Sequence, residues 1–160
     1  GSRSDVVRPG WGAALRVLQD ELPADRRSHV RRAAREALGA PMEELFERFD
    51  WAPLASASVA QVHRATLRDG GGAVAVKVQH EGIAELMRRD FRDALRIARF
   101  LARREDKYAP MVTILEAWAR EVEKELDFRY EVDNLRRVRR NLARAGVDVV
   151  VPEPVDGRVG

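Results

Sequence analysis

The stretch PLASASVAQVHRATLRDGGGAVAVKVQ, residues 53–79, decides the fold of this chain. Residues 59–67 alternate between apolar and polar side chains, which is typical of a half-buried strand. RDGGG, residues 68–72, has the composition of a hairpin turn, and AVAVKVQ, residues 73–79, continues as a second strand. The stretch therefore predicts an antiparallel hairpin whose second strand carries one lysine, Lys77.

The predicted second strand has two unlike faces. Side chains alternate along a strand, so its valines share one face, which we expect to lie on the core. The opposite face holds small residues and ends in an amine: Ala73, Ala75, Lys77 and Gln79. Two core strands with a lysine that reaches solvent would account for this pattern without any site.

The order of strand, small-residue loop, strand and lysine is also that of a kinase-type nucleotide pocket. In such a pocket a loop covers the phosphates, and a lysine on the third strand holds two of them. The corresponding loop here is ASASVAQ, residues 55–61, which has no glycine. Small side chains still allow the backbone close to a ligand, but each Cβ narrows the range of loop conformations.

Composition limits the alternatives. A chain of 160 residues is long enough for one domain with a core. Its pI is near 9.8, but the net charge is only +3 and acidic residues alternate with basic ones, so we expect no specific nucleic-acid binding. There is no cysteine, which excludes disulfides and thiolate metal sites. No apolar run approaches the roughly 18 residues of a membrane span.

The rest of the pattern is helical apart from one strand near the end. Asp25 is a candidate cap and Gly39 a candidate end for the second helix. The last helical segment, residues 111–144, is expected to kink or break near residues 126–128. The helices are predicted at 5–22, 25–40, 41–49, 83–105 and 111–144, and a short strand in VDVVVPEPV, residues 147–155. The first fifty residues are thus expected to be helical, and the fold class is α+β with a small antiparallel sheet.

One acidic residue stands out in the last predicted helix. An apolar stripe at helical spacing comprises Phe128, Val132, Leu135, Val138 and Leu142. Glu131 falls inside this stripe, where a buried carboxylate would need a partner. Lys77 is the natural candidate for that partner. Alternatively, Glu131 lies at the edge of the stripe and reaches water, and the pattern does not decide between the two.

Glu125 and Asp127 form a second acidic pair in KELDF. Residues two apart point about 200° apart in a regular helix, so they could share a ligand only at a break. Both are equally compatible with solvated surface charges.

Taken together, these segments resemble the UbiB/ABC1/ADCK (AarF-type) family of atypical kinase-like proteins. The matching pieces occur in family order over nearly the whole chain: LQDELP, ELFERFDWAPLASASVAQVHRA, GGAVAVKVQHEGI, ELDFRYEVDN and VVVPEPV. The resemblance implies the N-terminal, small lobe of a kinase-like fold with additional helices. It further implies a helical extension over residues 1–50 that lacks the family's KxGQ motif, a small lobe with inserted helices over 51–160, and an absent large lobe.

The resemblance also implies roles for individual residues. The loop corresponds to the family's alanine-rich substitute for the glycine loop, Lys77 to the nucleotide-binding lysine, and Glu131 to its paired glutamate. Glu125 and Asp127 match the regulatory ExD motif. Glu81 stands where the family usually has proline. The implied nucleotide-binding residues are Ala55, Ser56, Ala57, Ser58, Val59, Ala60, Gln61, Ala75, Lys77 and Glu131.

By this resemblance the ligand is ATP or ADP with Mg²⁺, and the partner in cis is the large lobe. No catalytic residue and no metal ligand is expected in these residues. The parent protein would support quinone or isoprenoid-lipid metabolism, with membrane lipid or quinone-biosynthesis proteins as further partners. The expected location is the cytoplasm, with membrane association through parts outside this chain. The alternative is a non-catalytic scaffold that binds a partner or a membrane surface through amphipathic helices such as LRIARFLARRE, residues 95–105.

Overall fold

The computed structural model describes residues 23–68 and 70–157, so the helix predicted at 5–22 lies outside the described residues. The chain forms two compact units. Of the described residues, those up to Glu81 form the sheet unit and those from Gly82 onward form the helical unit. The helices that precede residue 50 therefore share a unit with the sheet.

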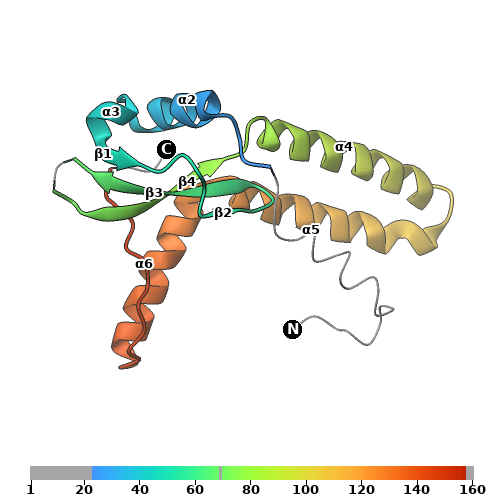
Figure 1. Ribbon diagram of the computed structural model, residues 1–160. Coiled ribbons are helices and arrows are strands. Elements are labelled where there is room, and N and C mark those ends of the chain that lie inside the picture. Colours follow the sequence, from blue (N-terminus) through green and yellow to red (C-terminus); the bar gives the residue numbers. More distant parts are fainter. Residues whose placement is uncertain (1–22, 69, 158–160) are drawn as a thin grey trace, which may run out of the picture. The chain divides into compact units, whose positions relative to one another are not determined.

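The sheet unit is built on one long antiparallel hairpin. Strands β3 (Ala60–Leu67) and β4 (Ala73–Gln79) pair along their length, which confirms the predicted hairpin (Figure 1). Two shorter strands, β1 (Phe46–Phe49) and β2 (Ala55–Ser56), pair antiparallel with β3 along its other edge. Strand β3 is thus the centre of a four-stranded antiparallel sheet.

The single helix predicted at 41–49 is wrong in its second half. Helix α3 covers only Met42–Leu45, and the chain then extends as β1. Phe46 lies opposite Leu67 in the pairing of β1 with β3. The partner strand is distant in sequence, so the local helical spacing could not reveal it. As a result, the first fifty residues are not all helical.

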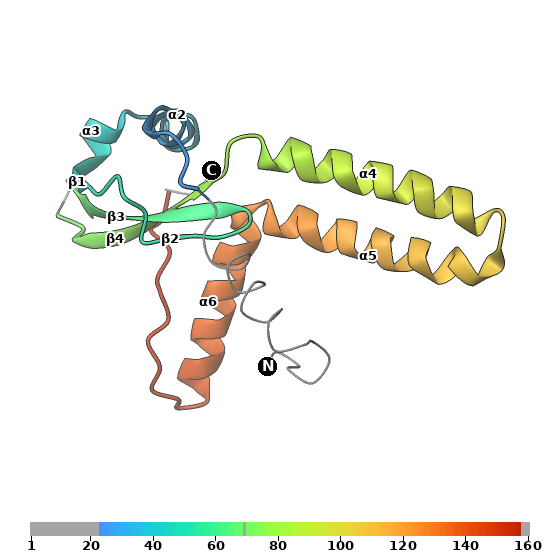
Figure 2. The ribbon, with the colours of Figure 1, turned by 45° about the vertical axis from the view of Figure 1, so that its right-hand side comes forward.

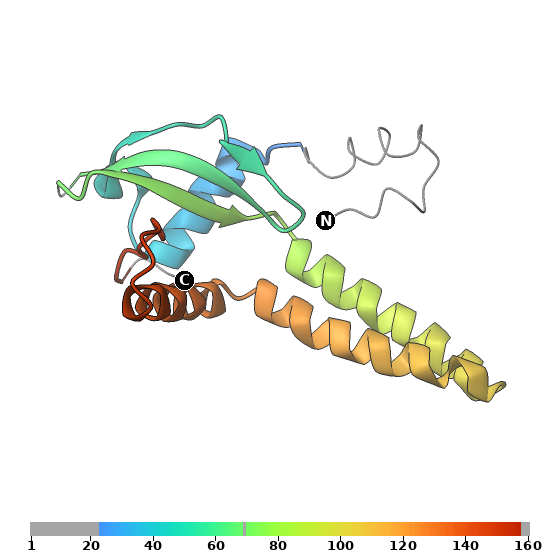
Figure 3. The same cartoon turned by 90° about the horizontal axis from the view of Figure 1, so that it is seen from below.

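The core of the sheet unit lies between the sheet and the helices that precede it. Helix α2 (Arg27–Leu38) contributes Val30 and Ala34, which are 1% and 5% exposed. Figure 2 shows α2 nearly end-on beside the sheet, and Figure 3 shows it crossing behind the strands. Gly39 ends the helix in the left-handed region at φ 71°, as predicted.

Asp25 does not cap α2, contrary to the sequence-based expectation. The capping position belongs to Arg26, which makes no side-chain cap bond. The Asp25 carboxylate instead lies 2.8 Å from Nδ1 of His80, at the far end of β4. A long-range partner has replaced the local one.

The helical unit begins with an antiparallel pair of helices. Helix α4 (Ile83–Ala102) and helix α5 (Ala109–Glu125) are joined through a short 3₁₀ turn, η1 (Asp106–Tyr108) (Figure 1). Ala98 of α4 is fully buried, and the Arg99–Glu116 ion pair, 2.8 Å, links the two helices. Helix α6 (Phe128–Arg144) follows after a break at Leu126–Asp127, which confirms the predicted interruption.

The strand predicted at 147–155 is absent from the structure. Residues 147–155 form no helix or strand, and the segment is tied to α6 by ion pairs from Arg136 to Asp156, 2.5 Å, and from Arg139 to Glu153. Pro152 and Pro154 lack the N–H that a strand ladder needs, so the end of this segment is a poor strand former. Over residues 23–68 and 70–157, no helix has the length and apolar content needed to cross a bilayer.

Candidate functional site

A row of three residues crosses one face of the sheet. Ala55 of β2 lies opposite Val62 of β3, and Val62 lies opposite Lys77 of β4. Directly opposed residues in antiparallel strands project to the same face. Lys77 and Ala55 are exposed, and Val62 is half-buried. The face therefore presents an amine beside a small apolar surface.

Ala75 extends this face by one step along β4. It is exposed and lies opposite Arg64 of β3, which is also exposed. The small face predicted from the alternation of β4 is therefore the open one. The valines of β4 lie on the other face, where Val78 is buried and Val74 and Val76 pack against the core.

Two residues of the predicted site point away from Lys77. Ser56 and Gln61 lie opposite each other, one register position from the Ala55–Val62 pair, so they project to the core face. Gln61 is fully buried, and its Oε1 accepts a 2.8 Å hydrogen bond from the backbone N–H of Asp25. Their side chains are therefore placed to support the loop rather than to face Lys77.

The middle of the alanine-rich loop, residues 55–61, is a tight turn between β2 and β3. The N–H of Ala57 donates to the carbonyl of Ala60 at 2.9 Å. His80 makes two contacts with this turn. Its backbone N–H donates to the carbonyl of Val59 at 3.0 Å, and its ring Nε2 lies 2.9 Å from the carbonyl oxygen of Ala57. No non-glycine residue of the described chain has a positive φ, so these bonds hold the turn without glycine geometry.

Lys77 and Glu131 belong to different units. Lys77 is exposed on the sheet unit, and Glu131 is exposed on the first turn of α6 in the helical unit. Glu131 thus reaches the surface of its own unit, as one of the two sequence-based readings expected. Its pairing with Lys77 stays a prediction.

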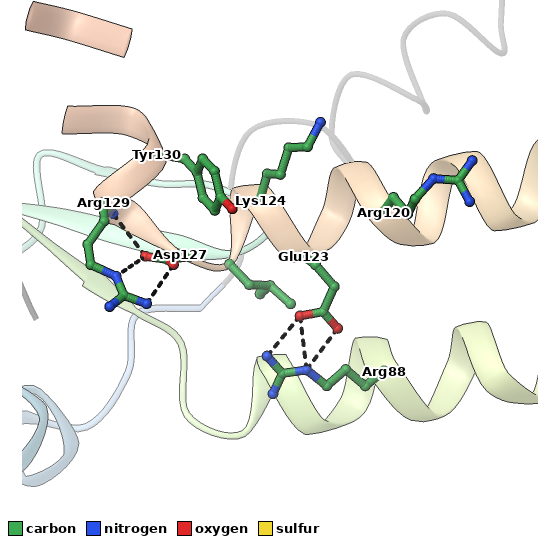
Figure 4. Close-up of a pocket in the computed structure, with 8 residues that line it drawn as sticks. Arg88, Arg120, Glu123, Lys124, Asp127, Arg129 and Tyr130 are labelled. Atoms are coloured by element: carbon green, nitrogen blue, oxygen red, sulfur yellow. Dashed lines mark hydrogen bonds and ion pairs between the residues drawn. The ribbon is translucent and has the colours of Figure 1, made fainter. Parts of the chain in front are cut away.

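Asp127 is the N-cap of α6. Its Oδ1 accepts from the backbone N–H of Arg129 at 3.0 Å, and both carboxylate oxygens accept from the Arg129 guanidinium at 2.8 Å (Figure 4). The side-chain bond to Arg129 holds the pKa of Asp127 below its usual value. Asp127 is thus engaged locally as a cap at the predicted helix break.

A pocket of about 760 Å³ opens beside this cap in the helical unit (Figure 4). Four cationic side chains and two carboxylates line the pocket. Both carboxylates are in ion pairs with cations of the lining, Glu123 with Arg88 at 2.9 Å and Asp127 with Arg129 at 2.8 Å. The bond to Arg88 holds the pKa of Glu123 below its usual value. Glu125 ends α5 and is not part of the lining. Much of the pocket's charge is therefore already neutralised.

The described residues offer no metal centre. Over 23–68 and 70–157, no group of three or more histidine, cysteine, aspartate or glutamate side chains could hold a metal ion. The exposed basic side chains on this face of the sheet, Lys77 and Arg64, favour an anion over a cation there.

Comparison with known proteins identifies the family of this chain. The model of the ABC1 atypical kinase-like domain matches residues 17–156. The chain belongs to the ABC1 atypical kinase-like family. The Probable protein kinase UbiB of Aeromonas salmonicida is 34% identical over 155 residues, and that of Vibrio cholerae, strain M66-2, is 34% identical over 154 residues. Each match covers 95% of this chain but only 28% of the relative.

A solved structure supports the ABC1 fold. Rv3197 from Mycobacterium tuberculosis, determined as a complex with erythromycin, matches with a TM-score of 0.59 and 34% identity. The match covers 80% of this chain and 32% of the other. The predicted family and the mixed fold with a small antiparallel sheet are therefore correct.

Sequence reasoning missed two residues of this candidate site. Val62 is the direct neighbour of Lys77, and the hairpin register would have identified it, since the turn at 68–72 fixes which residues face each other. His80 has no sequence neighbours at the spacing of a metal or catalytic motif, so no local pattern singles it out. Only the folded turn reveals its contacts with Ala57 and Val59.

Proposed function

We propose that the sheet unit is the nucleotide-binding part of an ABC1-type kinase-like protein. The observation that carries the proposal is the exposed row Ala55–Val62–Lys77 beside the alanine-rich loop, in a chain of this family. The amine of Lys77 would bind phosphate oxygens, and the apolar surface of Val62, Ala55 and Ala75 would take the adenine ring.

The ligand in this proposal is ATP or ADP. Magnesium, where bound, would neutralise phosphate charge, and we assign it no ligand among the described residues. The chain spans 28% of the length of the UbiB relatives named above, so the activity of the whole protein is itself a proposal. On family resemblance, we place that activity in quinone metabolism.

Titration of the ¹⁵N-labelled chain with Mg-ADP and Mg-ATP tests this function. Amide signals of the alanine-rich loop, Ala75 and Lys77 should shift with added nucleotide at millimolar concentration. Lys77→Ala should strongly reduce the shifts at the loop, because it removes the cation of the row and leaves only Arg64 on this face. Lys107→Ala is the matched control, since Lys107 lies in the helical unit and pairs with Glu105. Equal shifts in wild type and Lys77→Ala would contradict the proposal.

The second candidate is a scaffold that binds through the α4–α5 hairpin. Large apolar side chains are exposed there, including Ile97 and Trp118, each 62% exposed. Flotation of the chain with anionic lipid vesicles would test the membrane version of this candidate. Binding that persists in Lys77→Ala and fails in an Ile97→Ser, Trp118→Ser double variant would support it.

A further inference from the structure

His80 connects three segments of the sheet unit. It follows β4 directly, and its side chain is only 9% exposed. Its backbone N–H donates to the carbonyl of Val59, and its ring Nε2 lies 2.9 Å from the carbonyl of Ala57. Its ring Nδ1 lies 2.8 Å from Oδ2 of Asp25, in the segment that precedes α2. One side chain thus joins the alanine-rich loop to that segment.

Both ring nitrogens of His80 lie at hydrogen-bond distance from an oxygen atom. Nδ1 lies 2.8 Å from a carboxylate oxygen of Asp25, and Nε2 lies 2.9 Å from the carbonyl oxygen of Ala57. Contacts at both nitrogens fix the orientation of the ring, and with it the position of the Ala57 carbonyl.

A second histidine lies beside this pair. Nε2 of His29 lies 2.9 Å from the carbonyl of Gln79 and 3.8 Å from Oδ2 of Asp25. Its Nδ1 lies 3.4 Å from a guanidinium nitrogen of Arg32 and 3.9 Å from Oε1 of Glu81, which pairs with Arg32 at 2.5 Å. Of the two histidine rings, His80 is therefore the nearer one to the Asp25 carboxylate, at 2.8 Å.

The position of His80 determines how the turn presents its amides. It holds the carbonyls of Ala57 and Val59, and in a trans peptide the following N–H points the opposite way. The N–H of Ser58 is thereby turned away from His80. In a glycine-rich loop the backbone reaches such orientations through positive φ, whereas this loop has none.

We propose that His80 and Asp25 form a positioning pair that fixes the alanine-rich loop and keeps the Ser58 amide available to a phosphate oxygen. The pair is a further determinant of nucleotide affinity, and this part rests on the proposed function. His80 touches no nucleotide in this scheme. It acts through the loop.

The first test needs no nucleotide. In the ¹⁵N-labelled chain, Asp25→Asn should change the ring nitrogen signals of His80 more than those of His63, because it replaces the carboxylate that Nδ1 of His80 faces. Equal changes at the two rings would overturn the proposal. The amide signals of the loop in the same spectra show whether the variant is folded.

The second test compares two histidine replacements by amide hydrogen exchange. His80→Phe keeps a ring and the backbone bond to Val59 but removes both ring bonds. His63→Phe is the control, because Nδ1 of His63 makes one similar bond, 2.9 Å to the carbonyl of Asp50, away from the turn. Exchange of the Ala57 amide should rise about 5-fold in His80→Phe, beyond any change in His63→Phe. Equal exchange in the two variants would overturn the proposal.

The third test measures Mg-ADP affinity. His80→Phe should weaken binding about 5-fold relative to His63→Phe, and His80→Arg should restore it, since a guanidinium can donate to both Asp25 and Ala57. Unchanged affinity in His80→Phe would remove the link to nucleotide. If the wild-type chain binds no nucleotide while the ring and exchange results hold, the proposed function fails and the positioning pair stands.

Discussion

At the scale of single residues, the main question is why the exposed face of β4 carries a lysine in a chain whose other basic residues are nearly all arginine. Only Lys77, Lys107 and Lys124 are lysines. A compact amine on a flexible stem can reach between a carboxylate and phosphate oxygens, whereas the broad guanidinium fork would need more room beside Val62. The strand alternation predicted the face of Lys77 from sequence. Its neighbour Val62 required the register.

Ala57→Gly should change the relative affinity for ATP and ADP. The Ala57 N–H and carbonyl both hold the turn, through Ala60 and His80. Glycine adds positive φ to the conformations that the loop can adopt, so the loop can meet the last phosphate differently. Parallel titrations of the variant and the wild type with Mg-ATP and Mg-ADP would measure the ratio of the two dissociation constants. An unchanged ratio would argue against a loop that faces the phosphates.

At the scale of elements, local patterns predicted the pieces whose partners lie nearby in sequence. The β3–β4 hairpin followed from alternation and glycines, and the break before α6 followed from KELDF. The predictions for two segments were wrong: a helix was predicted where β1 forms, and a strand where residues 147–155 form neither helix nor strand. Strand formation depends on whether a free sheet edge lies beside the segment, and local sequence does not show this. Phe46–Phe49 has such an edge on β3, and residues 147–155 instead follow α6 through ion pairs.

Phe46→Ala should destabilise the sheet unit by about 3 kcal/mol, because it empties a core position in β1. Phe46 is 5% exposed and belongs to the cluster with Met42 and Leu67. Phe100→Ala makes the same chemical change at a side chain that is 48% exposed, and should cost less than about 1 kcal/mol. Urea unfolding would measure both, followed through the amide signals of β3 for Phe46→Ala and through those of α4 for Phe100→Ala. Equal costs would show that β1 does not anchor the core.

At the scale of the whole molecule, the family resemblance carried what local patterns could not. The division after Glu81 separates Lys77 from Glu131, so their relation depends on how the two units meet. The spacing of apolar residues along the sequence does not encode how the two units meet. The roles of these residues came from the family, and they stay predictions about the assembled protein.

A cross-link would test the predicted pairing of Lys77 with Glu131. The chain has no cysteine, so Lys77→Cys with Glu131→Cys gives two unique thiols. A short bis-maleimide should join them if the two positions face each other. Lys77→Cys with Arg140→Cys is the control, because residue 140 lies roughly 13 Å further along α6. More cross-linking in the control pair than in the test pair would contradict the pairing.

The chain by itself should bind nucleotide weakly and catalyse no phosphoryl transfer. Phosphoryl transfer depends on positioning and on neutralising phosphate charge, much of which a metal supplies. By family resemblance, we expect the residues that would hold this metal to lie in the large lobe. Lys77 is exposed, so solvent screens its charge, and millimolar affinity is about the strongest binding we expect. Calorimetric titration with Mg-ATP, together with an ADP-release assay, would measure both properties. Micromolar binding or turnover that disappears in Lys77→Ala, but not in Lys107→Ala, would show instead that these 160 residues hold a complete site.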